Sequence, residues 1–202
     1  MTGSMMTRAA LAALLLNAAL AGGCSGSSDD ENEILPIVAD IAITDTSSSD
    51  PQAVYLERVS AAGDLVTVNV MLRTTTTPVT FDAYSLEIEL DTGLVSVAAV
   101  DFLSSPLASC SPLTVSAISD NSTLVIGVAA SGSTCPGGYT TNTSTPEILV
   151  TLGLRAATTG SSELHFVSDP LSTGHCSILN ILSDIGIPCV DGSPAPTLTA
   201  TR

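Results

Sequence analysis

The sequence predicts an all-β fold, namely an antiparallel β-sandwich of the jelly-roll type with about nine strands. Three observations lead to this prediction. Apolar residues recur mostly at every second position after residue 53, and Gly and Pro residues interrupt these runs with turns. No amphipathic helix follows the N-terminal segment, apart from a short helical turn expected within residues 177–183. Aromatic residues make up only 3% of the chain, so the core has to be aliphatic.

The clearest single strand is residues 66–73, where Val and Leu alternate with mainly polar neighbours, a pattern typical of a half-buried strand. In the next segment the apolar parity changes between Phe81 and Tyr84. Such a change without a turn predicts a β-bulge near Asp82 and Ala83. Further strands are expected at residues 94–97 after a turn at 91–93, at 114–118, at 123–130 in the middle of a sheet, at 148–156 and at 163–167.

The charge balance excludes some classes of function. The chain has 5 Lys and Arg residues against 20 Asp and Glu residues, which gives a formal net charge of -15. Such a chain is repelled by phosphate backbones, so no nucleic acid is expected as a partner. Because 45% of the residues are hydrophobic and only 12% are charged, the chain is also too apolar to be a disordered acidic tail.

The N-terminal segment is expected to be an export signal. Residues 9–21 are apolar except for Asn17, and about 13 residues are too few to span a bilayer as a helix. Small residues and Cys24 follow, in a pattern that resembles the lipobox of bacterial lipoproteins. We therefore expect a lipoprotein signal peptide at residues 1–23, lipidation of Cys24, a flexible acidic tether at 24–38 and one domain at 39–202. The alternative is a plain secretory peptide in which Cys24 is incidental.

This resemblance also implies a location. A membrane lipid anchor at Cys24 would hold the domain at the cell envelope, and Ser25 rather than Asp after the cysteine is compatible with an outer-membrane lipoprotein that faces the periplasm or the surface. The acidic run at residues 29–33 is expected to stay solvated and extended.

The remaining cysteines agree with export. An even number in an exported chain predicts a disulfide framework, and four cysteines allow three connectivities. We expect sequential pairing because each sequential pair brackets a polar or Gly- and Pro-bearing excursion. Zinc is the alternative, but the chain has no Cys-x-x-Cys motif. The expected disulfides are Cys110–Cys135 and Cys176–Cys189.

Residues 63–70 and 81–95 carry a resemblance to a known family. The first segment resembles the opening strand of a cohesin domain, and the second resembles the bulged cohesin strand and the turn that follows it, with Leu90 and Thr92 in place of the usual Tyr and Pro. Residues 124–131 and 148–155 fit later cohesin strands, and Asp191-Gly192 lies where cohesins often turn into their last strand. Related carbohydrate-binding modules share this jelly roll.

The resemblance implies a non-enzymatic binding module whose protein partner belongs to the dockerin-like class, in a context of polysaccharide breakdown. In cohesins the partner docks on one flat sheet face. Here the outward residues Ser85, Glu87 and Glu89 of the bulged strand would belong to that face. The alternative class is a carbohydrate-binding module. Sugar rings lie on exposed aromatic side chains, and the parity of the strands leaves Tyr55 and Tyr139 for that role.

Catalytic chemistry is not expected. No nucleophile elbow, zinc-protease motif, P-loop or EF-hand occurs in the sequence, and only two histidines are present. His165 is expected to point outward from a strand, and His175 to lie in a loop, so a secreted hydrolase is the least favoured alternative. No cofactor is expected. Calcium is the metal that the acidic residues Asp82, Glu87, Glu89 and Asp91 would bind, although a solvated acidic face is the favoured interpretation.

Overall fold

The structure is a computed structural model. The part of the chain that it describes contains fifteen β-strands and one short 3₁₀ helix. This part comprises residues 35–43, 51–119, 122–167, 176–180 and 183–202. It contains no helix that is long and apolar enough to cross a membrane. The elements are β1 (Val38–Ala42), β2 (Gln52–Ala62), β3 (Leu65–Thr74), β4 (Thr80–Phe81), β5 (Ala83–Glu89), β6 (Val95–Asp101), η1 (Pro106–Cys110), β7 (Leu113–Ile118), β8 (Thr123–Ala129), β9 (Tyr139–Thr140), β10 (Glu147–Ala156), β11 (Gly160–Glu163), β12 (His165–Phe166), β13 (Cys176–Asn180), β14 (Ser183–Asp184) and β15 (Thr197–Thr201).

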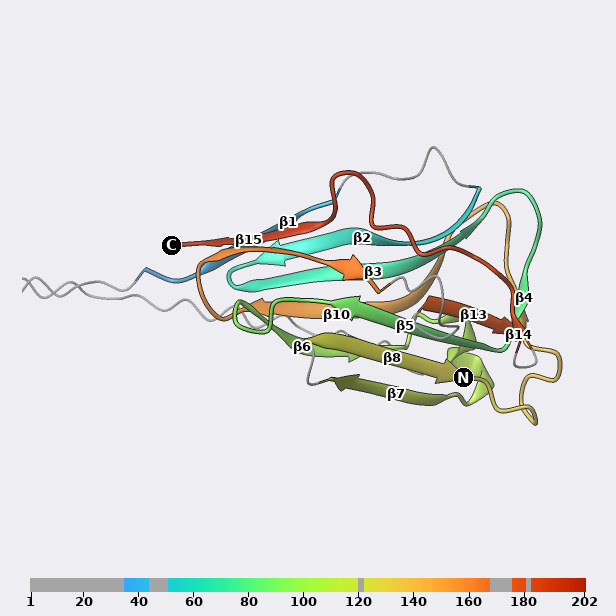
Figure 1. Ribbon diagram of the computed structural model, residues 1–202. Coiled ribbons are helices and arrows are strands. Elements are labelled where there is room, and N and C mark those ends of the chain that lie inside the picture. The colour runs from blue at the N-terminus through green and yellow to red at the C-terminus, as the bar shows by residue number, and fades with distance from the viewer. Residues whose placement is uncertain (1–34, 44–50, 120–121, 168–175, 181–182) are drawn as a thin grey trace, which may run out of the picture. The chain divides into compact units, whose positions relative to one another are not determined.

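Two larger sheets carry most of the fold, and all strand pairs within them are antiparallel. One has the order β2-β3-β10-β6, and the other has the order β14-β13-β5-β8-β7 with β12 also paired to β5. We call them the four-stranded and the six-stranded sheet. Figure 1 shows β2, β3 and β10 one after another, followed by β5, β8 and β7. Smaller sheets are formed by β1-β15-β11 and by β4-β9.

The core between the layers is aliphatic, as the composition predicts. Val68 and Leu152 of the four-stranded sheet and Leu86 and Ile126 of the six-stranded sheet are all fully buried. One buried polar contact joins the layers, because the Tyr84 hydroxyl on β5 donates a hydrogen bond to a backbone carbonyl oxygen of β10 at 2.6 Å. This fold confirms the expected all-β sandwich.

The expected interruption near Asp82 is present as a break between β4 and β5. Phe81 before the break and Tyr84 after it are both buried, so the chain changes parity at this point. Backbone hydrogen bonds hold the break: the Asp82 N–H donates to the Leu179 carbonyl at 2.9 Å, and the Ala130 N–H donates to the Asp82 carbonyl at 2.7 Å. The turn at residues 91–93 is also present, with the Leu94 N–H bonded to the Asp91 carbonyl at 3.0 Å.

Three local predictions are wrong, each because of tertiary packing. Residues 177–183 do not start a helical turn, since residues 176–180 form β13, which pairs with β5. Residues 163–167 are not one strand: Glu163 belongs to β11, which pairs with β15, and His165 belongs to β12, which pairs with β5. The strand at residues 66–73 is not half-buried at its end, because Arg73 is only 5% exposed.

The break between β4 and β5 and the separation of β11 from β12 help to explain why the strands are shorter and more numerous than the nine expected. The short helical turn expected within residues 177–183 is replaced by strand at residues 176–180. The described helix lies instead at Pro106–Cys110 and begins at an N-cap, Ser105, whose side chain accepts a hydrogen bond from the Leu107 N–H. β8 lies between β5 and β7, which confirms the central position expected for residues 123–130.

Candidate binding face

The strand β5 presents the three polar residues expected on its outward side. Tyr84, Leu86 and Ile88 are at most 1% exposed and point into the core. The residues between them, Ser85 and Glu87, are half-buried, and Glu89 is exposed. The period of two along a strand therefore places Ser85, Glu87 and Glu89 on the side of the six-stranded sheet that faces away from the core.

The neighbouring strands add apolar residues to this side. Directly paired residues lie on the same side of a sheet. Ser85 pairs with Gly127 and Glu87 pairs with Val125, and on the next strand Val115 pairs with Gly127. We define the outer face as the outward residues of these three strands: Ser85, Glu87, Glu89, Val125, Gly127, Ala129, Leu113, Val115 and Ala117.

The outer face combines an acidic stripe with an exposed apolar stripe. Leu113 is 78% exposed and Val115 is 62% exposed, because β7 is the last strand of the sheet. Gly127 lies between the two stripes and has no side chain, so the surface there forms a low strip. A Cβ atom built at Gly127 would meet no atom within 4 Å. The sequence predicts the strand at residues 114–118, but its exposure depends on which strands lie beside it.

A hydrogen-bonded cluster surrounds His165 at the end of β5, where His165 pairs with Glu89. The two ring nitrogens of His165 lie 3.2 Å from Asp191 Oδ2 and 3.0 Å from Glu163 Oε2. Asp191 also accepts a hydrogen bond from the Phe166 N–H at 2.6 Å. His165 is thus a member of a cluster that joins β11, β12 and the segment after Cys189, and the sequence does not reveal this because the three groups come from separate segments.

The cluster leaves no ring nitrogen of His165 for a serine hydroxyl, since both face carboxylates. The second histidine, His175, lies outside the described residues. Within the described part of the chain, no group of three His, Cys, Asp or Glu side chains is arranged to hold a metal ion.

The His165 cluster gives a pH prediction. Burial lowers the pKa of His165, but hydrogen bonds and charges from Asp191 and Glu163 outweigh it and raise that pKa above 6.5. A raised pKa in the folded state means that the cluster stabilises the fold fully below pH 6.5, and that this contribution is lost as the pH rises through the folded pKa. We expect His165→Gln to destabilise the chain more at about pH 5.5 than at about pH 8.5, as measured by urea unfolding. An equal loss at both pH values would contradict the prediction.

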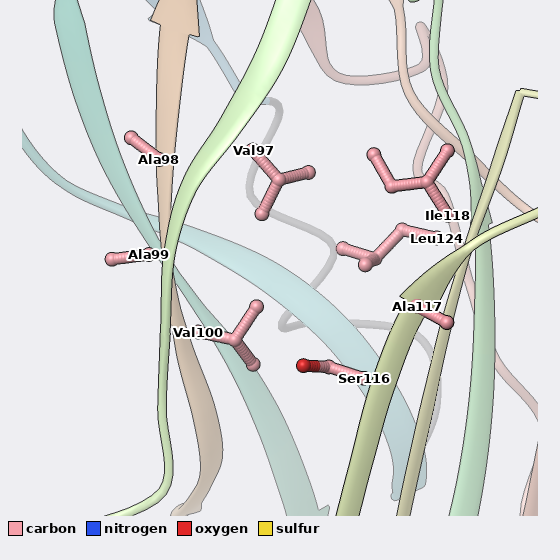
Figure 2. Close-up of a pocket in the computed structure, with 8 residues that line it drawn as sticks. All are labelled: Val97, Ala98, Ala99, Val100, Ser116, Ala117, Ile118 and Leu124. Carbon is pink, nitrogen blue, oxygen red and sulfur yellow. The ribbon is translucent and has the colours of Figure 1, made fainter.

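A cavity of about 320 Å³ opens beside the outer face, between the edge strands of the two sheets, and most of the residues that line it are aliphatic. We call it the seam. In Figure 2, Val97 and Val100 of β6 point across it toward β7 and β8, whereas Ala98 and Ala99 point away. The seam is lined by Val97, Ala98, Ala99, Val100, Ser116, Ala117, Ile118 and Leu124.

The structure places Tyr55 and Tyr139 away from the outer face. Tyr55 lies on β2 of the four-stranded sheet, and the guanidinium carbon of Arg73 lies 4.9 Å from its ring centroid. Tyr139 lies on β9, its ring centroid 5.9 Å from that of Phe81 in an edge-on arrangement. Its hydroxyl donates a hydrogen bond to Glu147 at 2.8 Å, and burial together with that carboxylate raises the pKa of Tyr139 to about 12.

The four described cysteines form the two expected pairs. Cys110 is bonded to Cys135, with their Cα atoms 5.2 Å apart, and Cys176 is bonded to Cys189, with their Cα atoms 6.2 Å apart. The second disulfide fastens β13, a strand beside β5, to a residue that forms a bridge with Val54 of β2. It therefore links the two sheets on the core side of β13, since Cys176 pairs with the buried Leu86. Cys24 lies outside the described residues.

Comparison with solved structures finds cohesins. A type II cohesin domain from the cellulosome of Acetivibrio cellulolyticus is 12% identical, with a TM-score of 0.48, over 74% of this chain and 95% of that one. CaCohA2 from Clostridium acetobutylicum is 18% identical, with a TM-score of 0.49, over 70% of this chain and 88% of that one. The sixth cohesin of the Acetivibrio cellulolyticus scaffoldin B, in complex with a Cel5 dockerin mutant, is 11% identical, with a TM-score of 0.47, over 70% of this chain and 95% of that one. No family model and no curated protein matches the chain.

Proposed function

We propose that this chain is a non-enzymatic binding module that engages a protein partner through the outer face. The observation that carries the proposal is the combination, on one regular sheet surface, of exposed apolar residues on β7 with the acidic residues of β5. Exposed apolar patches of this kind mark interaction sites on soluble domains. Within the described residues the only histidine has both ring nitrogens paired with carboxylates, and a binding role accounts for the face without any catalytic group.

A protein is favoured over a polysaccharide as the ligand of this face. The aromatic side chains in the described strands of the six-stranded sheet, Tyr84 and Phe166, are 1% and 4% exposed and point inward. The face therefore offers no ring on which a sugar could stack. A surface that alternates carboxylates with aliphatic side chains instead suits a partner that presents basic and apolar groups.

The sequence resemblance supplies the partner class. If the chain acts as cohesins do, the partner is a dockerin-like module, and the wider context is polysaccharide breakdown. We further propose, from the N-terminal sequence, that a lipid on Cys24 holds the module at the cell envelope, as an outer-membrane lipoprotein.

Affinity capture tests the binding proposal. The purified chain is used as bait in an extract of the source organism, and captured material is scored for dockerin-bearing proteins and for glycans. Reversing two charges with Glu87→Lys and Glu89→Lys is expected to weaken capture of the protein partner, and added salt is expected to weaken it too. The free energy of unfolding should change by no more than about 0.5 kcal/mol, because neither side chain belongs to the core.

Two further variants sharpen this test. Glu57→Lys reverses one charge in the same way, but on an exposed residue of β2, so it should leave capture unchanged. Gly127→Trp fills the low strip of the outer face and should block capture without touching either acidic residue. Capture that survives both the Lys pair and Gly127→Trp, but is lost on replacing Tyr55 or Tyr139 with Ala, would overturn the proposal in favour of a carbohydrate-binding module.

A further inference from the structure

The edge strand β7 has an unusual surface for the last strand of a sheet. It pairs with β8 through six consecutive residues without a register shift, and no other described strand pairs with it. All six residues are exposed, and three of them are large and apolar: Leu113, Val115 and Ile118. Proteins normally protect such an edge with charges, proline or a bulge, and none of these is present within the strand.

The electrostatics of this edge differ from those of the rest of the chain. The net charge is -15, yet neither β7 nor any residue that lines the seam is charged. Two copies of the chain repel each other through their acidic surfaces. This repulsion is weaker where a neutral surface of one copy meets the same surface of the other, so the edge of β7 is a surface on which two copies can approach each other.

We propose that β7 is a self-association edge, on which two copies of this chain pair antiparallel, β7 to β7. Backbone N–H and C=O groups along the free side of each β7 would hydrogen-bond to those of the other copy, and the two six-stranded sheets would become one. With Val115 opposite its own counterpart, Leu113 of each copy lies opposite Ala117 of the other. The exposed apolar side chains of the two strands then lie side by side and shield part of one another from water.

The size of this contact sets its strength. A six-residue strand is about 20 Å long, and a stable protein interface buries about 1,600 Å² in total. A contact between two six-residue edge strands is small by this measure. The dimer is therefore reversible, and its population depends on the concentration of the chain and on the salt that screens the remaining repulsion.

Sedimentation equilibrium of the full chain, in a density-matched detergent, tests the proposal. We expect the average mass to rise toward that of two chains with concentration, and association to strengthen when salt is raised. This salt dependence is opposite to that expected for partner capture by the acidic stripe. The two proposals therefore fail separately, and the Glu87→Lys, Glu89→Lys chain should still dimerise.

Substitutions on the edge complete the test. Val115→Asp places two carboxylates opposite each other and should weaken dimerisation by about tenfold or more. Val59→Asp is the matched control. Val59 is also an exposed valine, since 49% of its surface is exposed and 62% of that of Val115, but it lies on β2. Ser116→Asp, which lies on the seam side of the same strand, repeats the test should Val115→Asp not fold. A chain that stays monomeric up to about 1 mM, or dimerises equally well with both edge variants, would overturn the proposal.

Discussion

Replacing Ile126 with alanine is expected to lower the free energy of unfolding by about 2–5 kcal/mol, the range for truncating a fully buried aliphatic side chain. Ile126 is 0% exposed and lies on β8, the strand between β5 and β7. The core is close-packed, so the neighbouring strands cannot fully collapse into the space that the side chain leaves. Urea unfolding followed by circular dichroism measures the change.

Val125→Ala is the matched control for this prediction. Val125 is the preceding residue of β8, is half-buried and belongs to the outer face. Removing its two methyl groups should cost less than about 1 kcal/mol, because part of its surface is already in contact with water. Equal losses of stability for the two variants would show that the outer and inner sides of the sheet are assigned wrongly.

Replacing Cys24 with alanine is expected to abolish acyl incorporation and to release the chain from membranes. The cysteine thiol is the only group in this segment that the proposed lipidation could modify, so the expected effect is complete loss rather than a graded one. Metabolic labelling with a radioactive fatty acid, together with fractionation of cells into membrane and soluble material, measures both consequences.

Ser28→Ala serves as the control for the anchor, because it alters a small residue of the same segment and leaves Cys24 in place. This variant should be labelled and retained like the unaltered chain. Membrane retention of the Cys24→Ala chain at the level of the control would contradict lipidation. The segment would then be a plain secretory peptide, and Cys24 would be incidental.

Part of the candidate site was predictable because it depends on one strand alone. The alternation of Tyr84, Leu86 and Ile88 with Ser85 and Glu87 is visible in the sequence, and burial of the first set places the second set outward. The other half of the outer face was not predictable. Val115 belongs to the strand expected at residues 114–118 and Leu113 lies just before it. They become an exposed stripe only because β7 has no neighbour beyond it among the described strands.

The His165 cluster shows the same limit. The sequence predicts that His165 points outward from a strand, which does not reveal its two carboxylate partners. Glu163 lies two residues away but on a strand of another sheet, and Asp191 is 26 residues away. Their meeting depends on the separation of β11 from β12 at Leu164, whose N–H donates to the carbonyl of Pro196.

The amino-acid sequence by itself determined the all-β class, the parity change at Asp82 and the turn at residues 91–93, and it favoured sequential pairing of the four described cysteines among three possible connectivities. Each of these follows from the period of two, from turn chemistry or from spacing along a short segment. Only the tertiary structure decided which strands are neighbours, that residues 176–180 extend the sheet beside β5, and that β7 forms its edge. The physical reason is that strands pair through backbone N–H and C=O groups, which are the same in nearly every residue. The side chains therefore encode which way a strand faces far more clearly than which strand lies beside it.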